Sequence, residues 1–295
     1  MPDTVLVAGA TGHVGSRLVP ELVARGLRVR ALSRSGDRPR PDVETVRADV
    51  LDRASLDEAF RGVRAAYYLV HGLADSDDLD EAERTGAENV AAAAEEAGVA
   101  RVVYLGGLAH GEGLSPHLRT RHEVGEILRR EGPLTIEFRA SVIVGSGSAS
   151  FELVRTLVDD APALVLPDWV DTPCQPIAIA DVVAYLVAAL DADVAESRVF
   201  EIGGADRITY AELLELYGDA VGTARPTLKL PAVPLPLPAL LAQVAPEQAR
   251  VWLRLVEGMQ FDSTVRDHSA AAVFDIAPSG VREAIDAAIR EPATS

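Results

Sequence analysis

The chain begins with the stretch VLVAGATGHVG at residues 5–15, and this stretch decides the fold. Its first four residues are aliphatic and suit a buried strand, and an amphipathic helix pattern follows the last glycine. Between them, Gly9 allows a tight turn, Gly12 lets backbone N–H groups approach a phosphate, and Gly15 lets the helix pack close to the strand. The positive end of the helix dipole would face the anion. This order predicts a dinucleotide-binding site, the alternative being a purely structural turn.

The composition is that of a folded globular protein. The 295 residues are 48% hydrophobic and 25% charged, enough to bury a large core. A net charge of −17 argues against general affinity for nucleic acid or an anionic membrane. A single cysteine, Cys174, cannot form an internal disulfide, which predicts a cytoplasmic protein. The longest uncharged run, residues 230–246, contains several prolines, so we expect no membrane span.

Strand and helix patterns alternate after the glycine turn. The expected strands are Leu27–Leu32, Val43–Arg47, Ala65–Val70, Arg101–Leu105 and Leu134–Val144. The expected helices are Ser55–Phe60, Leu79–Ala97 and Val124–Arg130. This alternation predicts an α/β fold with a doubly wound parallel sheet, whose ligands bind at the carboxyl ends of the strands. We expect residues 1–205 to form the dinucleotide-binding core and residues 206–295 a smaller C-terminal substrate lobe.

Several motifs together resemble a known superfamily. They are the GxxGxxG turn, Asp49 after the third strand, AIADV at residues 178–182, and VFEIGG at residues 199–204 followed by ITYAELL at residues 208–214. This pattern is similar to the short-chain dehydrogenase/reductase superfamily. Its atypical and extended branches are nearest, close to the NmrA-like and complex-I-subunit-like NAD(P)-binding proteins. The resemblance implies a Rossmann fold and an oxidoreductase of that superfamily.

The resemblance also implies a set of cofactor contacts. Asp49 and Val50 would meet the adenine edge, and Val70, His71 and Gly72 would line the adenosine ribose. His71 has an alternative interpretation as a loop histidine without cofactor contact. The full expected set is Gly9, Thr11, Gly12, His13, Val14, Gly15, Arg34, Asp49, Val50, Val70, His71, Gly72 and Arg121.

The residue after the second strand bears on the choice between NAD and NADP. An acidic side chain there would accept hydrogen bonds from the ribose 2′-hydroxyl and repel a 2′-phosphate. This chain has Arg34 instead, whose guanidinium can hold a phosphate bidentately, and the nearby acid Asp37 lies further into the loop. We therefore expect NADP(H) to be preferred, with NAD(H) also accepted. The alternative is that Arg34 is a solvated surface charge.

The chain departs from the superfamily in its catalytic pair. Typical members use Tyr-x-x-x-Lys, in which tyrosine is the general acid or base and lysine binds the nicotinamide ribose. The only lysine here is Lys229, and no Tyr-x-x-x-Lys exists in the sequence. The matching positions carry His117 and Arg121. Histidine has a pKa of about 6.5 and can donate a proton near neutral pH, and a nearby Arg121 would lower that pKa. The alternative is a solvated residue at a helix start.

Other candidate sites carry weaker signals. Four acids between Asp75 and Asp80 lack the glycine and distal glutamate of a calcium loop, and favour a helix start instead. The six histidines lack metal-ligand spacing, so we expect no metal. No base near Cys174 suits a nucleophile. Residues 145–151 are expected to shape a substrate or nicotinamide pocket. Phe151, Trp169 and residues 230–246 would form an apolar lid over it or pack as ordinary core and surface.

Two functions from different classes follow. The first is an NADP(H)-dependent oxidoreductase acting on an apolar carbonyl, quinone-like or conjugated small molecule, with His117 and Arg121 as the catalytic residues. The second is a non-catalytic NADP(H)-binding sensor or structural protein of NmrA type. Retention of a working pair favours the first, and the absent tyrosine and lysine favour the second. The sequence does not indicate an oligomeric state.

Overall fold

A seven-stranded parallel sheet forms the centre of the protein. The computed structural model describes residues 3–36, 40–72, 79–160, 164–166, 168–223, 227–229 and 249–291. The strands are β1 (Thr4–Ala8), β2 (Arg28–Ser33), β3 (Glu44–Arg47), β4 (Val63–Tyr68), β5 (Arg101–Gly107), β6 (Thr135–Ala140) and β11 (Arg198–Ile202). Their order across the sheet is β3-β2-β1-β4-β5-β6-β11. The doubly wound Rossmann sheet expected from the alternation is confirmed, with its switch point between β1 and β4.

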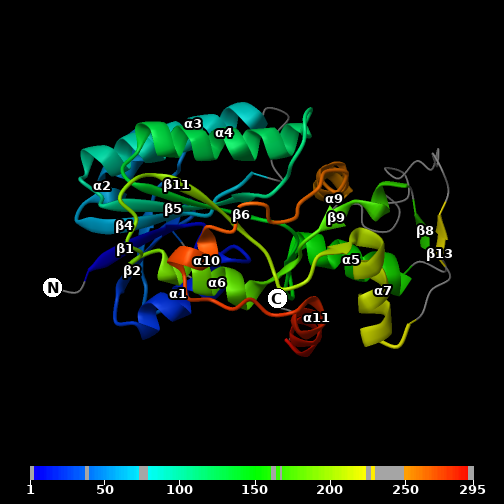
Figure 1. Cartoon of the computed structure of the whole chain (residues 1–295). Coiled ribbons are helices and arrows are strands. Elements are labelled where there is room, and N and C mark those ends of the chain that lie inside the picture. Colours follow the sequence, from blue (N-terminus) through cyan, green and yellow to red (C-terminus); the bar gives the residue numbers. More distant parts are fainter. Residues whose placement is uncertain are drawn as a thin grey trace.

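Helices cover both faces of the sheet (Figure 1). One face carries α2 (Arg53–Phe60), α3 (Leu79–Glu96) and α4 (Pro116–Glu131), and the other α1 (Gly15–Ala24), α6 (Ile179–Ala188) and α10 (Ala270–Val273). Strand β1 explains this arrangement, because its successive side chains point to opposite faces. Val5 and Val7 belong to the core cluster with Leu18 of α1, whereas Leu6 packs with Phe60 of α2 in the other cluster. A strand buried on both sides needs an uninterrupted aliphatic run, as this one has.

Two elements differ from the expected boundaries in ways that matter for the site. Helix α4 begins at Pro116, eight residues before the periodic pattern starts. Ser115 caps it by accepting a hydrogen bond from the Leu118 amide, and proline suits the first helical position. The expected strand Leu134–Val144 is interrupted, because β6 ends at Ala140 and β7 (Ile143–Val144) pairs instead with β10 (Ile177–Ala178).

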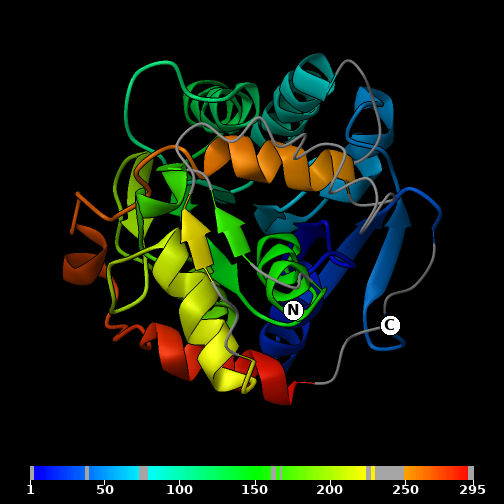
Figure 2. The ribbon, with the colours of Figure 1, turned by 90° about the vertical axis from the view of Figure 1, so that its right-hand side faces the viewer.

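A second hydrophobic core lies beyond the carboxyl ends of the strands (Figures 1 and 2). Its helices are α5 (Ala149–Asp160), the 3₁₀ helix η1 (Asp168–Asp171), α7 (Tyr210–Ala220), α9 (Ala249–Gly258) and α11 (Val281–Arg290). The short strand pairs here are β7 with β10, β9 (Pro173–Cys174) with β12 (Ile208–Thr209), and β8 (Leu164–Leu166) with β13 (Thr227–Lys229). This core contains segments from both sides of residue 205. The expected division into a dinucleotide-binding core of residues 1–205 and a substrate lobe of residues 206–295 therefore stays a prediction.

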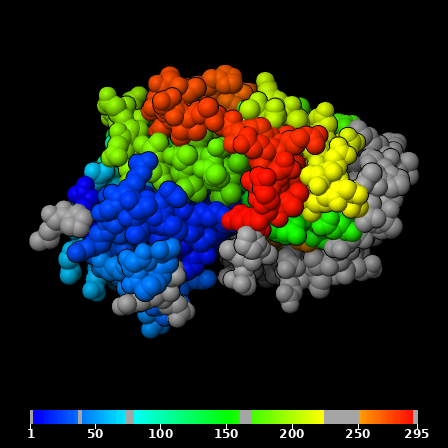
Figure 3. Space-filling view, turned by 90° about the horizontal axis from the view of Figure 1, so that it is seen from below, coloured from blue at the N-terminus to red at the C-terminus, as the bar shows by residue number. Residues whose placement is uncertain are grey.

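The C-terminal helix joins the two parts of the molecule. Figure 3 shows α11, in red, lying between the N-terminal part, in blue, and α7, in yellow. Just past its end, Glu291 forms an ion pair of 2.7 Å with Arg17 of α1. In the part of the chain that the structure describes, no helix combines the length and apolar character needed to cross a membrane.

Candidate functional site

A cleft of about 340 Å³ lies at the carboxyl ends of β1, β4, β5 and β6. This is the position at which open α/β sheets bind their ligands. The cleft brings together parts of the chain that are more than one hundred residues apart. Eight of the residues expected at the site line it, namely Gly9, Gly12, His13, Val14, Gly15, His71, His117 and Arg121.

Each of the three positions in the turn after β1 requires glycine for a different structural reason. Gly9 has a φ of +90°, a conformation that side chains other than glycine rarely adopt. At Gly15 a Cβ would lie 2.1 Å from the Gly9 carbonyl oxygen, so a side chain there cannot fit. At Gly12 the nearest atom to a Cβ would be that same oxygen at 3.3 Å, and the residue is exposed to the cleft. Gly9 and Gly15 are thus needed to form the turn, whereas Gly12 leaves the surface of the turn open to the cleft.

The backbone of this turn fits the pyrophosphate of a dinucleotide. The amide of Gly12 donates to the Gly9 carbonyl at 3.0 Å. The amides of His13 and Val14, which precede α1, have no hydrogen-bond acceptor among the residues that the structure describes. Such unsatisfied N–H groups at a helix N-terminus are the usual binding site for a phosphate.

His13 is held by a hub of contacts centred on Arg17. The Arg17 guanidinium lies 3.1 Å from His13 Nδ1 and donates to the His13 carbonyl and, at 2.7 Å, to the Ser146 carbonyl. Burial, and then the charge of Arg17, lower the pKa of His13 to about 4. His13 is therefore neutral at physiological pH, and Arg17 connects the glycine turn with the loop after β7.

The remaining expected cofactor residues lie outside the cleft lining. These are Thr11, Arg34, Asp49, Val50, Val70 and Gly72. The Asp49 carboxylate accepts the Leu51 amide at 3.0 Å, and the buried Val50 offers its carbonyl to Asn89 at 2.9 Å. Both residues therefore shape the turn after β3, and their adenine contact stays a prediction.

Arg34 lies in the exposed turn after β2, where a second arginine adjoins it. Arg47, the last residue of β3, is paired in register with Ser33 and donates to the Arg34 carbonyl at 3.3 Å. The backbones of Arg34 and Arg47 therefore lie side by side at the carboxyl ends of β2 and β3. The sequence analysis did not consider Arg47, although its position at the end of the third strand was the available signal. Asp37 and Arg38 lie outside the described residues.

His117 and Arg121 lie on the first two turns of α4 and face the cleft. The Arg121 guanidinium lies 5.3 Å from the centre of the Tyr104 ring and donates to the Leu105 carbonyl. The Tyr104 hydroxyl in turn donates to the Arg121 carbonyl at 3.1 Å. These contacts with β5 fix the start of α4. His117 is half-buried in the first turn of α4, and its role in catalysis stays a prediction.

The surroundings of His117 make it a poor acid at neutral pH. Burial, and then the charges of Arg121, His71 and Arg254, lower the pKa of His117 to about 3. The imidazole is therefore neutral at pH 7. A neutral ring still donates one N–H hydrogen bond, so His117 suits hydrogen bonding to an oxygen better than proton release.

The far wall of the cleft comes from the ends of β6 and β7. The lining residues of this wall are Ser141, Gly147, Ser148, Ala149 and Ser150. The last four agree with the expected role of residues 145–151 in shaping a pocket. Phe151 is fully buried against Tyr217, so it packs in the second core and not as a lid. Trp169 is half-buried and packs against the same core. Residues 230–246 and the acids Asp75, Asp77 and Asp78 lie outside the described residues.

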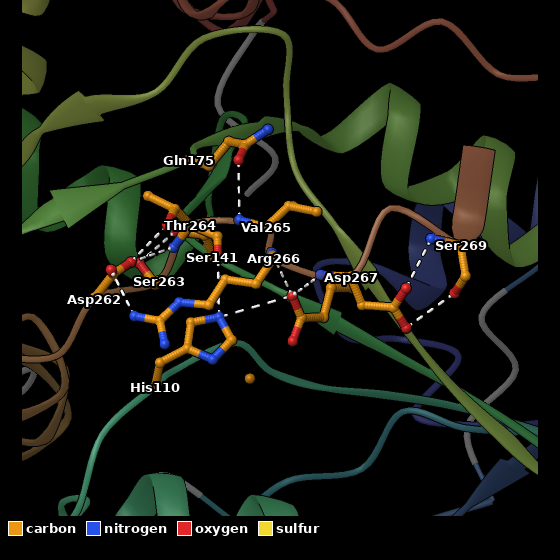
Figure 4. A network of polar contacts seen from close by, with 12 residues as sticks. His110, Ser141, Gln175, Asp262, Ser263, Thr264, Val265, Arg266, Asp267 and Ser269 are labelled. Carbon is orange, nitrogen blue, oxygen red and sulfur yellow. Dashed lines mark hydrogen bonds and ion pairs between the residues drawn. The ribbon is translucent and has the colours of Figure 1, made fainter.

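A polar network positions Ser141 (Figure 4). Its hydroxyl lies 2.8 Å from that of Ser263, and the segment around Ser263 is fixed at several points. The Val265 amide donates to Gln175 at 3.0 Å, and the Asp267 amide donates to Glu201 at 3.0 Å. The segment that includes Ser263 thus crosses the ends of β6 and β11, a connection between distant residues that the sequence did not signal.

Comparisons with known proteins agree with this geometry. Residues 9–134 match a family described as NAD(P)H-binding. The chain is 31% identical over 264 residues to a (4-alkanoyl-5-oxo-2,5-dihydrofuran-3-yl)methyl phosphate reductase of Streptomyces griseus, covering 86% of each protein. The chain belongs to the NAD(P)-binding short-chain dehydrogenase/reductase superfamily.

Two further members extend the comparison. A divinyl chlorophyllide a 8-vinyl-reductase of Zea mays is 30% identical over 252 residues, covering 77% of this chain and 62% of that protein. The solved structure of the enzyme WbmH of Bordetella bronchiseptica, in complex with NAD⁺, superimposes with a TM-score of 0.72 at 17% identity, covering all of both chains. The reductases establish a reductase-type family, and the solved structure establishes the shared fold.

Proposed function

We propose that this member of the superfamily is an NADP(H)-dependent oxidoreductase that reduces an apolar carbonyl, quinone-like or conjugated small molecule. The observation that carries the proposal is that His117 and Arg121 line the same cleft as the glycine turn. Apolar side chains of Leu69, Leu105 and Leu255 complete the lining and favour an apolar substrate. Both relatives named above are reductases.

In this proposal the glycine turn would hold the pyrophosphate, and NADPH, when bound, would supply the hydride for reduction of an electrophilic carbon of the substrate. Reduction by two electrons also needs one proton, which goes to the substrate oxygen or to the neighbouring carbon. The neutral His117 donates a hydrogen bond to the oxygen as negative charge develops on it, and Arg121 adds a fixed positive charge nearby. Water supplies the proton, because the imidazolium form of His117 is scarce at neutral pH.

We further propose that NADPH is preferred over NADH. Arg34 and Arg47 start from the same edge of the sheet, where the 2′-phosphate of the adenosine ribose would lie. The alternative function, a non-catalytic NADP(H)-binding protein of NmrA type, is favoured by one observation. Arg121 already donates to Leu105 and stacks on Tyr104, contacts that hold the helix without any substrate. A cytoplasmic location is part of the same proposal, since the single cysteine is buried and free.

Mixing the purified protein with NADPH and a panel of conjugated aldehydes and quinones tests the function. Oxidation of NADPH is followed by absorbance, and the reduced product is identified by mass. Turnover of at least one class supports the reductase. Tight NADPH binding without hydride transfer to any member of the panel would instead support the sensor or structural protein.

A further inference from the structure

Helix α9 packs beside α4 (Figure 2). A Cβ on Gly258 would lie 3.5 Å from Cδ1 of Leu118, the residue after His117. Arg254 lies four residues before Gly258 and therefore shares this face of the helix. The next residue, Leu255, lines the cleft, whereas Trp252 is buried in the second core. Helical geometry thus places Arg254 on the side of α9 that faces α4, next to the residue Leu255 that lines the cleft.

The electrostatics agree with this placement. The positive charge of Arg254 lowers the pKa of His117, in addition to the larger effects of burial and of Arg121. It is also felt by Glu83, where it opposes the burial that raises the pKa of that carboxyl. Its charge thus acts on one group of α4 and on one group of α3.

Arg254 has no ion pair or hydrogen-bond acceptor among the residues that the structure describes, although it is half-buried. Other partly buried arginines of the protein differ in this respect. Arg84 pairs with Glu123 at 2.7 Å, and Arg17 pairs with Glu291 at the same distance. A half-buried arginine without a hydrogen-bond acceptor keeps its guanidinium N–H groups available for a ligand. It is thus prepared to bind an anion that arrives with a ligand.

We infer that Arg254 forms an anion subsite at the opening of the cleft, which binds a carboxylate or phosphate carried by the substrate. The inference rests on the proposed function and adds to it that the substrate is apolar at its reacting end and anionic at the other. A protein of net charge −17 would otherwise repel such a molecule, so local positive charge is needed for its binding.

Equilibrium binding to the NADP⁺-loaded protein tests the subsite without any turnover. Two pairs of probes are used in calorimetry: cinnamate against its neutral isostere cinnamamide, and 3-phenylpropyl phosphate against 3-phenylpropanol. We expect at least one anion to bind roughly ten- to a hundredfold more tightly than its neutral partner, as for one charge-assisted contact. The pair that shows the larger ratio distinguishes carboxylate from phosphate.

Variants assign the effect to Arg254. Arg254→Gln should abolish the preference for the anion, while the affinity for the neutral probe and for NADP⁺ stays unchanged. Arg254→Lys should retain part of the preference. The matched control is Arg119→Gln, which removes the same charge from an exposed position of α4 and should retain the full preference. A wild-type protein without preference for either anion would overturn the inference, and so would an equal loss in Arg119→Gln. Absence of hydride transfer would affect only the proposed function, because the binding assay does not depend on it.

Discussion

The glycine turn after β1 and the start of α4 line the same cleft, but their properties arise differently. In the turn, backbone sterics dominate: the φ of Gly9 is +90°, and a Cβ on Gly15 would lie 2.1 Å from the carbonyl oxygen of Gly9, six positions away. One further restriction comes from a distant residue, because a Cβ on Gly9 would lie 2.8 Å from the Leu69 carbonyl oxygen. At the start of α4, the chemistry of His117 depends on charges from several elements, including Arg254 more than one hundred residues away. Local geometry is therefore readable from sequence, whereas the protonation of a cleft residue requires the fold.

The largest expected effect separates packing from binding within the turn. Gly15→Val places a side chain against the backbone of Gly9 and Ala10, which cannot move without displacing β1. We expect a loss of about 3 kcal/mol or more in the free energy of unfolding, measured by urea denaturation. Gly12→Ala is the control and should be close to wild type, since its Cβ would meet only one atom at 3.3 Å. Equal stability of the two variants would show that this part of the turn is not close-packed.

The second prediction concerns binding without loss of the fold. Gly12→Val places a branched side chain over the free amides of His13 and Val14, on the exposed surface of the turn. We expect the affinity for NADPH to fall at least roughly a hundredfold, or about 2.8 kcal/mol, while circular dichroism stays close to that of wild type. Titration by NADPH fluorescence gives the affinity. NADPH binding as tight as in wild type would show that the turn serves packing only and does not bind the dinucleotide.

A smaller effect is expected at the adenosine end. Arg34→Ala should lower the preference for NADPH over NADH by roughly ten- to a hundredfold, because one charge-assisted contact to the 2′-phosphate is removed. The control is Arg28→Ala, which changes an exposed arginine at the opposite end of β2. If wild type binds NADH more tightly, or if the ratio is unchanged in Arg34→Ala, the interpretation of this edge is wrong.

The smallest effect is a dependence of stability on pH. Burial lowers the pKa of His13 and His122 to about 4 and that of His117 to about 3, below the value of 6.5 in the unfolded chain. Between these values the unfolded state binds more protons, so stability falls as the pH falls through this window and is unaffected above it. Each histidine contributes a slope of at most about 1.4 kcal/mol per pH unit. His122→Gln should reduce the slope between pH 6.5 and 4.5, and an unchanged slope would contradict the burial of this ring.

The sequence predicted much of the fold and the position of the cleft. The alternating pattern gave the core strands and helices, because each depends on a local hydrophobic period. The start of α4 at Pro116 was missed, since it depends on the N-cap hydrogen bond that Ser115 accepts from the Leu118 amide and not on hydrophobic periodicity. Arg47, Arg254 and the Ser141–Ser263 contact were also missed, because their place in the site follows from pairing or packing between distant segments. His117 was identified only through a family position, and its low pKa required its neighbours.

One kinetic measurement tests the central claim, that a neutral His117 assists hydride transfer in this cleft. With the best substrate of the panel, His117→Phe should retain the NADPH affinity and lose roughly 10²–10³-fold in turnover, as for the loss of one hydrogen-bond donor to a developing oxyanion. His117→Tyr, which restores the side chain usual in the superfamily, should retain much of the activity. The wild-type rate should show no transition near pH 6.5, because the pKa of His117 lies at about 3. Full activity in His117→Phe would contradict the account and exclude this residue from the mechanism.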